Sequence, residues 1–64
     1  MTDFSERLRA ARLRKGLTQQ QMADRLNLHR TAYTKYETTD VEPSLTTFCK
    51  IVRILDVDPM ELLE

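Results

Sequence analysis

The sequence predicts an all-α fold, because two short helical patterns lie close together, the composition suits helices, and the chain is short. It has 64 residues, of which 31% are charged and 6% aromatic, with one Gly and two Pro. Such a composition favours helices and offers little for a sheet. A chain of this length forms one domain, whose core rarely contributes more than roughly 3–5 kcal/mol of stability. We therefore predict a compact five-helix domain that spans residues 1–64.

The segment 18–37 contains the two helical patterns, separated by a break that is too short for a loop. Thr18 can cap the first helix with its hydroxyl, and Gln21 can reach back to complete a capping box. Asn27 follows this helix, and asparagine tolerates the left-handed conformation that a sharp stop needs. The apolar face of the helix consists of Met22, Ala23 and Leu26. Two helices joined in this way form a helix-turn-helix.

The second helix of this motif starts near His29 and has an apolar face, formed by Tyr33 and Tyr36. Because successive residues are about 100° apart around a helix, the opposite side carries a polar face without acidic residues. It consists of Thr31, Thr34, Lys35 and Thr38, with Arg30 at the N-terminal flank. Such a face can enter a DNA major groove and touch base edges. An ordinary amphipathic helix would show a similar solvated face, so it is the two-helix context that favours the DNA interpretation.

A first helix is predicted from about Phe4 to Lys15, and Gly16 ends it. Arg12 falls on the apolar stripe of this helix, where an unpaired buried charge would cost several kcal/mol. Arg12 therefore needs an acidic partner, or its side chain must extend to water. The stripe consists of Phe4, Leu8 and Ala11.

Two more helices are predicted in the C-terminal half. Ser44 can cap the first of them, which runs to about Leu55, and Asp58-Pro59 marks the start of the second. The apolar face of the longer helix consists of Leu45, Phe48, Cys49, Val52 and Leu55. Because Cys49 lies within this stripe, we expect it in the core rather than in redox or nucleophilic chemistry. The last helix carries apolar residues that either close the core or contact a second subunit: Met60, Leu62 and Leu63.

The charges of the chain are unevenly distributed, although the net charge is zero. Residues 1–35 hold eight Arg and Lys against three acidic residues, which gives +5, and residues 36–64 hold two against seven, which gives −5. A net charge of zero argues against nucleic-acid binding, which normally leaves a basic footprint. A protein polarised in this way can nevertheless present its basic side to phosphate groups.

Several classes of function are disfavoured by the residues that the chain lacks. It has one histidine, His29, one cysteine, no cluster with metal-ligand spacing and no Gly-rich phosphate loop. We therefore expect no enzyme activity, no cofactor, no metal and no small-molecule substrate. A single cysteine allows no intrachain disulfide, and the sequence shows no signal peptide and no long apolar run. We expect a cytoplasmic protein without a membrane partner.

Over nearly its whole length the chain resembles the helix-turn-helix family of the lambdoid phage repressors and Cro proteins. The residues that carry the resemblance are Arg12, Gly16-Leu17-Thr18-Gln19, Ala23, Leu26, Tyr36-Glu37 and Pro43-Ser44-Leu45. The resemblance implies a lambda-repressor-like fold and a sequence-specific regulator of transcription that binds double-stranded DNA. It further implies a repressor that binds a pseudo-palindromic operator as a homodimer, formed in solution or only on DNA, with its third helix in the major groove.

The resemblance and the direction of the polar face together imply the residues of the site. We expect base contacts from Arg30, Thr31, Thr34 and Lys35. We expect phosphate contacts from Gln19, His29, Thr38 and Ser44. Helix starts suit phosphate, because backbone N–H groups and polar side chains meet its oxygens there. In the family, the arginine that matches Arg12 pairs with the glutamate that matches Glu37, which implies a structural ion pair here.

Departures from the family pattern favour an alternative, a helix-turn-helix-shaped interaction module such as an antitoxin or adapter, with weak or no DNA binding. Thr39 stands where the family usually has glycine, and a β-branched residue resists positive φ. Asp40 and Glu42 place negative charge in a loop that the family often uses beside phosphates, and His29 is a weaker cap than serine or threonine. We prefer DNA binding, because the basic half contains the recognition surface. A phage repressor, an antitoxin and a restriction-system controller all fit.

Overall fold

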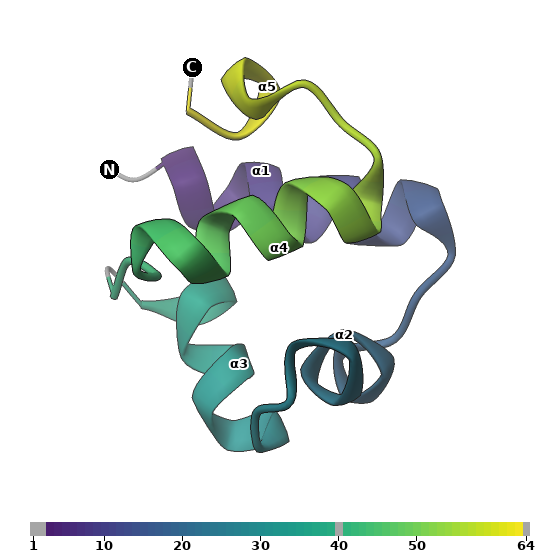
Figure 1. The fold of residues 1–64 in the computed structure, drawn as a ribbon, viewed down its shortest axis with the longest axis vertical. Helices are drawn as coiled ribbons and strands as arrows, with labels where there is room; N and C mark the ends of the chain where they lie inside the picture. The colour runs from purple at the N-terminus through teal and green to yellow at the C-terminus, as the bar shows by residue number, and fades with distance from the viewer. Residues whose placement is uncertain (1–2, 40, 64) are drawn as a thin grey trace.

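The fold is all-helical, as the sequence predicts. The computed structural model describes residues 3–39 and 41–63, and within them the chain forms five α-helices and no strand. In chain order these are α1 (Asp3–Lys15), α2 (Gln19–Leu26), α3 (Arg30–Thr38), α4 (Leu45–Leu55) and α5 (Pro59–Leu63). Figure 1 shows α1 and α4 across the middle of the molecule, α5 at one end, and α2 and α3 at the other. Helix α1 contacts α3, α4 and α5, so the other elements are organised around it.

The caps predicted at the two ends of α2 form. The backbone N–H of Gln21 donates to the Thr18 hydroxyl oxygen at 3.0 Å, and the Thr18 N–H donates to Gln21 Oε1 at 2.9 Å. Asn27 ends α2 in the left-handed conformation, with a φ of 61°. Only two residues, Leu28 and His29, then separate Asn27 from α3. The tight stop at Asn27 thus sets the turn between the two helices.

Helix α3 ends without a left-handed residue. Thr39 follows it in an extended conformation, with φ −132° and ψ −178°, so a β-branched residue fits there without strain. The Thr39 hydroxyl and backbone N–H both donate to the Lys35 carbonyl oxygen, at 2.7 and 3.0 Å. The absence of glycine at this position therefore does not disturb the end of α3. Asp40 lies outside the described residues.

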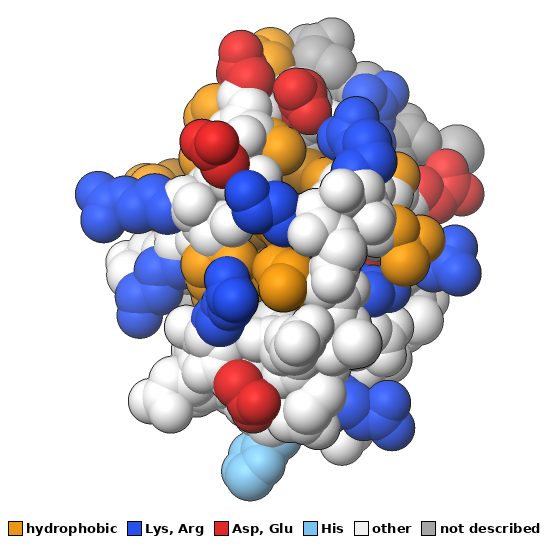
Figure 2. All heavy atoms as spheres, turned by 90° about the vertical axis from the view of Figure 1, so that its right-hand side faces the viewer, with side chains coloured by type: hydrophobic (Ala, Val, Ile, Leu, Met, Phe, Trp, Pro, Cys, Tyr) orange, Lys and Arg blue, Asp and Glu red, His pale blue; other side chains and the backbone are white. Residues whose placement is uncertain are grey.

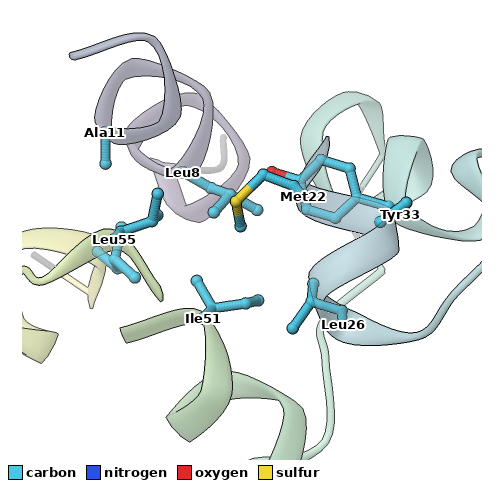
Figure 3. Packing of buried hydrophobic residues seen from close by; sticks show 9 residues of the cluster. Leu8, Ala11, Met22, Leu26, Tyr33, Ile51 and Leu55 are labelled. Carbon is cyan, nitrogen blue, oxygen red and sulfur yellow. The ribbon is translucent and has the colours of Figure 1, made fainter. Parts of the chain in front are cut away.

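One hydrophobic core receives side chains from every helix (Figure 3). Its buried members are Leu8, Ala11, Met22, Ala23, Leu26, Tyr33, Ile51, Leu55 and Leu62. Half-buried residues, including Phe4 and Phe48, pack around it, and the centres of these two rings are 6.2 Å apart. Leu62 closes the core and is fully buried, whereas Met60 and Leu63 on the same short helix stay 51% and 58% exposed.

The prediction that Cys49 belongs to the core is wrong. Cys49 is exposed, and so is Leu45, at 77% of its surface. The face of α4 that is turned inward is centred on Ile51 and Leu55, which are buried. A residue two positions from Ile51 lies about 200° around the helix, so Cys49 points almost directly away from the core. The spacing of apolar residues allowed either orientation of α4, and packing against the other helices selected one.

No helix in residues 3–39 or 41–63 has the length and apolar character that crossing a membrane requires.

The assignment of the inner face of α4 can be tested with two truncations on the same helix. Ile51→Ala is expected to lower the free energy of unfolding by about 2–5 kcal/mol, because it removes fully buried methyl groups and leaves a cavity. Cys49→Ala is expected to change it by less than about 0.5 kcal/mol, because this side chain is exposed. Equilibrium urea unfolding measures both. Similar destabilisation by the two variants would mean that α4 faces the core differently.

Candidate nucleic-acid interface

The outward face of α3 carries the residues for which base contacts are expected. Arg30, Thr31 and Lys35 are exposed, and Thr34 is half-buried beside α2. The acidic residue of α3, Glu37, is buried and faces inward. This outward face therefore offers hydrogen-bond donors and positive charge, and no carboxylate of α3 competes with them.

Figure 2 shows the side of the molecule on the right of Figure 1. Lys and Arg side chains are spread over its middle, and acidic side chains gather mainly at the upper end, where α5 lies. The lower end, formed by the helix-turn-helix, is mostly uncharged and polar and carries the histidine. On this side of the molecule, most of the acidic side chains thus lie away from α2 and α3.

The four residues expected to contact phosphate lie at the ends of helices. His29 precedes α3 as its N-cap, is exposed, and makes no side-chain capping hydrogen bond. Ser44 caps α4 by accepting from the Thr47 N–H at 3.2 Å. Thr38, in the last turn of α3, donates its hydroxyl proton to the Thr34 carbonyl oxygen at 3.0 Å. Gln19, at the start of α2, is half-buried and has both ends of its amide engaged.

The structure contains the ion pair between Arg12 and Glu37. Arg12 Nε donates to Glu37 Oε2 at 2.7 Å, and Arg12 Nη2 donates to Glu37 Oε1 at 3.1 Å. The two side chains are only 8% and 0% exposed, so Arg12 does not extend to water. Arg12 Nη1 also donates to the Leu17 carbonyl oxygen at 2.8 Å, at the start of the motif. This paired geometry fixes the last turn of α3 to both α1 and the segment that leads into α2.

Two further side chains complete the hydrogen bonds of the Glu37 carboxylate. The Tyr33 hydroxyl donates to Glu37 Oε2, and Gln19 Nε2 donates to Glu37 Oε1 at 3.1 Å. The other end of the Gln19 amide, Oε1, accepts from the Thr34 hydroxyl at 3.2 Å. The sequence reasoning missed both roles. The spacing of four between Tyr33 and Glu37 was a usable signal, whereas nothing local in the sequence links Gln19 to α3.

The network keeps the two ends of the pair charged. Burial by itself would raise the pKa of Glu37, but hydrogen bonds from Arg12, Tyr33 and Gln19 outweigh it and lower that pKa below its usual value. The hydrogen bond to Glu37 likewise raises the pKa of Arg12. Burial, together with the neighbouring carboxylate, raises the pKa of Tyr33, so its hydroxyl stays protonated and acts as a donor.

A second ion pair, between Arg14 and Glu61, differs from the first in being exposed to solvent. Arg14 Nη2 and Glu61 Oε1 are 3.1 Å apart, but the side chains are 66% and 48% exposed. Solvent screens such a pair, and its contribution is typically about 0–1 kcal/mol. It joins the last turn of α1 to α5.

Comparison with known proteins identifies the family. A family model described as helix-turn-helix matches residues 8–62, which is most of the chain. The chain belongs to the helix-turn-helix family. The resemblance to its repressor and Cro branch, first indicated by the motif residues, is confirmed.

Two relatives come from Bacillus subtilis (strain 168). The uncharacterized HTH-type transcriptional regulator YqaE is 52% identical over 54 residues, which cover 84% of this chain and 47% of YqaE. The SPbeta prophage-derived uncharacterized HTH-type transcriptional regulator YonR is 46% identical over 61 residues, which cover 95% of this chain and 56% of YonR. The chain thus spans about half the length of these two relatives.

A solved structure has the same fold. The restriction-modification controller protein C.AhdI from Aeromonas hydrophila superposes with a TM-score of 0.83 at 35% sequence identity. The match covers 94% of this chain and 91% of the C.AhdI chain. The predicted fold class is therefore confirmed.

Breaking the buried pair is expected to destabilise the domain strongly. Glu37→Ala strands the Arg12 charge in a buried position and should lower the free energy of unfolding by about 3–5 kcal/mol, enough to leave much of the protein unfolded. Glu61→Ala is the matched control, since it breaks the exposed pair and should cost less than about 1 kcal/mol. Thermal and urea unfolding of both variants measures this difference. A melting temperature of Glu37→Ala within a few degrees of wild type would contradict it.

The lowered pKa of Glu37 predicts a loss of stability in acid. Because the folded-state pKa lies below the unfolded value of about 4.3, ionised Glu37 stabilises the fold above that pH. The stabilisation is lost as the pH falls further, through the folded-state pKa. Glu37→Gln cannot titrate there, so its unfolding free energy should fall less steeply than that of wild type below about pH 4.3. Parallel stability curves for wild type and Glu37→Gln, each measured by urea unfolding, would rule out this contribution.

Proposed function

We propose that the protein is a sequence-specific regulator of transcription that binds double-stranded DNA with α3 in the major groove. The observation that carries this proposal is the outward face of α3, free of carboxylates and held in place from behind by the Arg12–Glu37 pair. The regulator names of YqaE, YonR and C.AhdI support it. Occupying an operator requires no chemistry, so the protein acts by binding, in the cytoplasm, where its DNA is.

Base readout is assigned to the outward side chains of α3. Arg30 and Lys35 can donate to guanine, whose O6 and N7 both accept in the major groove. Thr31 can place its methyl group against the methyl group of thymine. Thr34, half-buried at the boundary with α2, is the fourth residue of this set.

Phosphate contacts are assigned to the helix ends around this face. Gln19 is the first residue of α2, where backbone N–H groups lack partners within the helix and attract anions. Because its side-chain amide is engaged with Glu37 and Thr34, its backbone is the better candidate for phosphate. His29 and Ser44 are the N-caps that precede α3 and α4, and Thr38 lies in the last turn of α3.

The proposed regulator is a repressor that binds a pseudo-palindromic operator as a homodimer. One small module contacts too few bases for tight specific binding, and two-fold protein symmetry matches a palindromic site. Exposed Met60 and Leu63 of α5 are the proposed contact, since Leu62 is used by the core. Leu63 shares a groove of about 300 Å³ with the exposed Leu45, which adds apolar surface to the same region.

An interaction module with little DNA binding is the second candidate, favoured by one observation. Glu42 is exposed in the segment that follows α3, where negative charge would repel a phosphate backbone. The objection from Thr39, however, is removed by its extended conformation. The two candidates differ in whether the protein binds duplex DNA at low salt.

Selection of bound sequences from random duplex DNA tests the proposal. We expect a palindromic consensus, two chains per duplex in sedimentation on that site, and affinity that falls steeply with salt as counterions are released. Arg30→Ala and Lys35→Ala should each cost about 1–3 kcal/mol of binding free energy and relax the preference at one position per half-site. Binding isotherms on the selected site and its single-base variants measure this.

Arg14→Ala is the matched control for these variants. It removes an exposed arginine of α1 that pairs with Glu61 of α5 and to which no base or phosphate contact is assigned, so it should leave base preference unchanged. If Arg30→Ala and Lys35→Ala leave both affinity and base preference unchanged, α3 is not the reader and the interaction module becomes the better description. If wild type binds tightly as a single chain, the dimer is wrong.

A further inference from the structure

We propose that Gln19 fixes the direction of the Thr34 hydroxyl, so that Thr34 reads DNA as a hydrogen-bond acceptor and selects a base whose amino group lies in the major groove, adenine or cytosine. This inference rests on the proposed function, because it assigns a base preference to one residue of the α3 face. It follows from a chain of hydrogen bonds that begins in the core at Arg12 and ends at Thr34 on the boundary of that face.

The first link makes Glu37 an acceptor only. Its carboxylate receives Nε and Nη2 of Arg12 at 2.7 and 3.1 Å in a buried site, which holds it in the ionised form. An ionised carboxylate has no proton to donate. Any group that contacts Glu37 Oε1 at hydrogen-bond distance must therefore be a donor.

The second link sets the orientation of the Gln19 amide. The amide has a donor end and an acceptor end, and its surroundings decide which way it points. Its Nε2 lies 3.1 Å from Glu37 Oε1. The reversed amide would place a carbonyl oxygen against a carboxylate oxygen, which is repulsive. The carbonyl oxygen Oε1 must therefore point the other way, toward Thr34.

The third link fixes the direction in which the Thr34 hydroxyl donates its proton. This hydroxyl lies 3.2 Å from Gln19 Oε1, an atom that can only accept. A threonine hydroxyl has one proton and two lone pairs, so once the proton points to Gln19 only lone pairs remain for other partners. Thr31 takes no part in this chain and has no such restriction. On the α3 face, Thr34 thus offers an acceptor whose direction is set from the core, whereas the Thr38 hydroxyl proton is held by the backbone carbonyl oxygen of Thr34.

The major groove turns this restriction into a base preference. Adenine N6 and cytosine N4 are the amino donors there, and the lone pairs of the Thr34 hydroxyl can accept from them. Guanine O6 and thymine O4 are acceptors, to which the Thr34 hydroxyl cannot donate while its proton points to Gln19. We expect adenine or cytosine to be favoured over guanine or thymine at the Thr34 position by about three- to tenfold, the value of one hydrogen bond. Gln19 is then a positioning residue for specificity.

Gln19→Met tests this chain of hydrogen bonds from Arg12 to Thr34, here called the relay, because methionine has similar length and no amide. It frees the Thr34 hydroxyl to donate, so the three- to tenfold preference should shrink toward onefold at this single position, with all other positions unchanged. Thr34→Val, which lacks the hydroxyl, should lose the same preference, and Thr34→Ser, which keeps it, should retain the preference. Gln20→Met is the matched control, since the Gln20 amide bonds to Asp24 at 2.9 Å, outside the network. Binding to the selected site and its three single-base variants gives each value.

The outcomes separate the relay from the other roles of Gln19. If Gln19→Met weakens all sequences alike, Gln19 is only a phosphate or structural contact and the relay is overturned. Retention of the preference in Thr34→Val also overturns it. Should Gln19→Met fail to fold, the Thr34→Val and Thr34→Ser variants still test the base preference, and hydrogen exchange of the side-chain NH₂ groups in the wild-type protein tests the bond from Gln19 to Glu37. Gln19 should exchange more slowly than Gln20, and equal rates count against the relay. Failure of wild type to bind any duplex rejects the proposed function instead.

Discussion

The buried ion pair between Arg12 and Glu37 is the interaction on which the arrangement of this domain depends. It joins residues 25 positions apart in the sequence and connects the central helix α1 to the end of α3. A buried pair of this kind need not stabilise a protein more than well-packed apolar residues would, because removing two charges from water is costly. Its directional hydrogen bonds nevertheless require one relative placement of the two helices, which hydrophobic contact alone would leave less defined.

The pair also separates the two faces of α3. Tyr33 and Glu37 point inward, where the hydroxyl and the carboxylate satisfy each other's hydrogen bonds, while Arg30 and Lys35 point outward and are free of acidic neighbours on their own helix. A core with few buried side chains thereby supports a surface whose side chains can vary without disturbing the fold.

The distribution of charge follows the same division. On the side shown in Figure 2, the helix-turn-helix end carries a largely polar surface next to Lys and Arg side chains, and most acidic side chains lie toward α5. Although the net charge is zero, the uneven distribution of charge produces an electric field. This field can orient the domain as it approaches a polyanion.

The sequence by itself determined the elements that depend on near neighbours. The capping box of Thr18 and Gln21, the left-handed stop at Asn27 and the five helices follow from contacts within a few residues, so they could be predicted. The resemblance to a known family added the Arg12–Glu37 pair, which no local pattern implies. Only the tertiary structure decided that Ile51 rather than Cys49 enters the core, and that Gln19 bridges Glu37 and Thr34, residues 18 and 15 positions away. The physical reason is that a helix with apolar residues on more than one side can be turned either way, and packing against the other helices selects which side is buried and which distant polar groups meet.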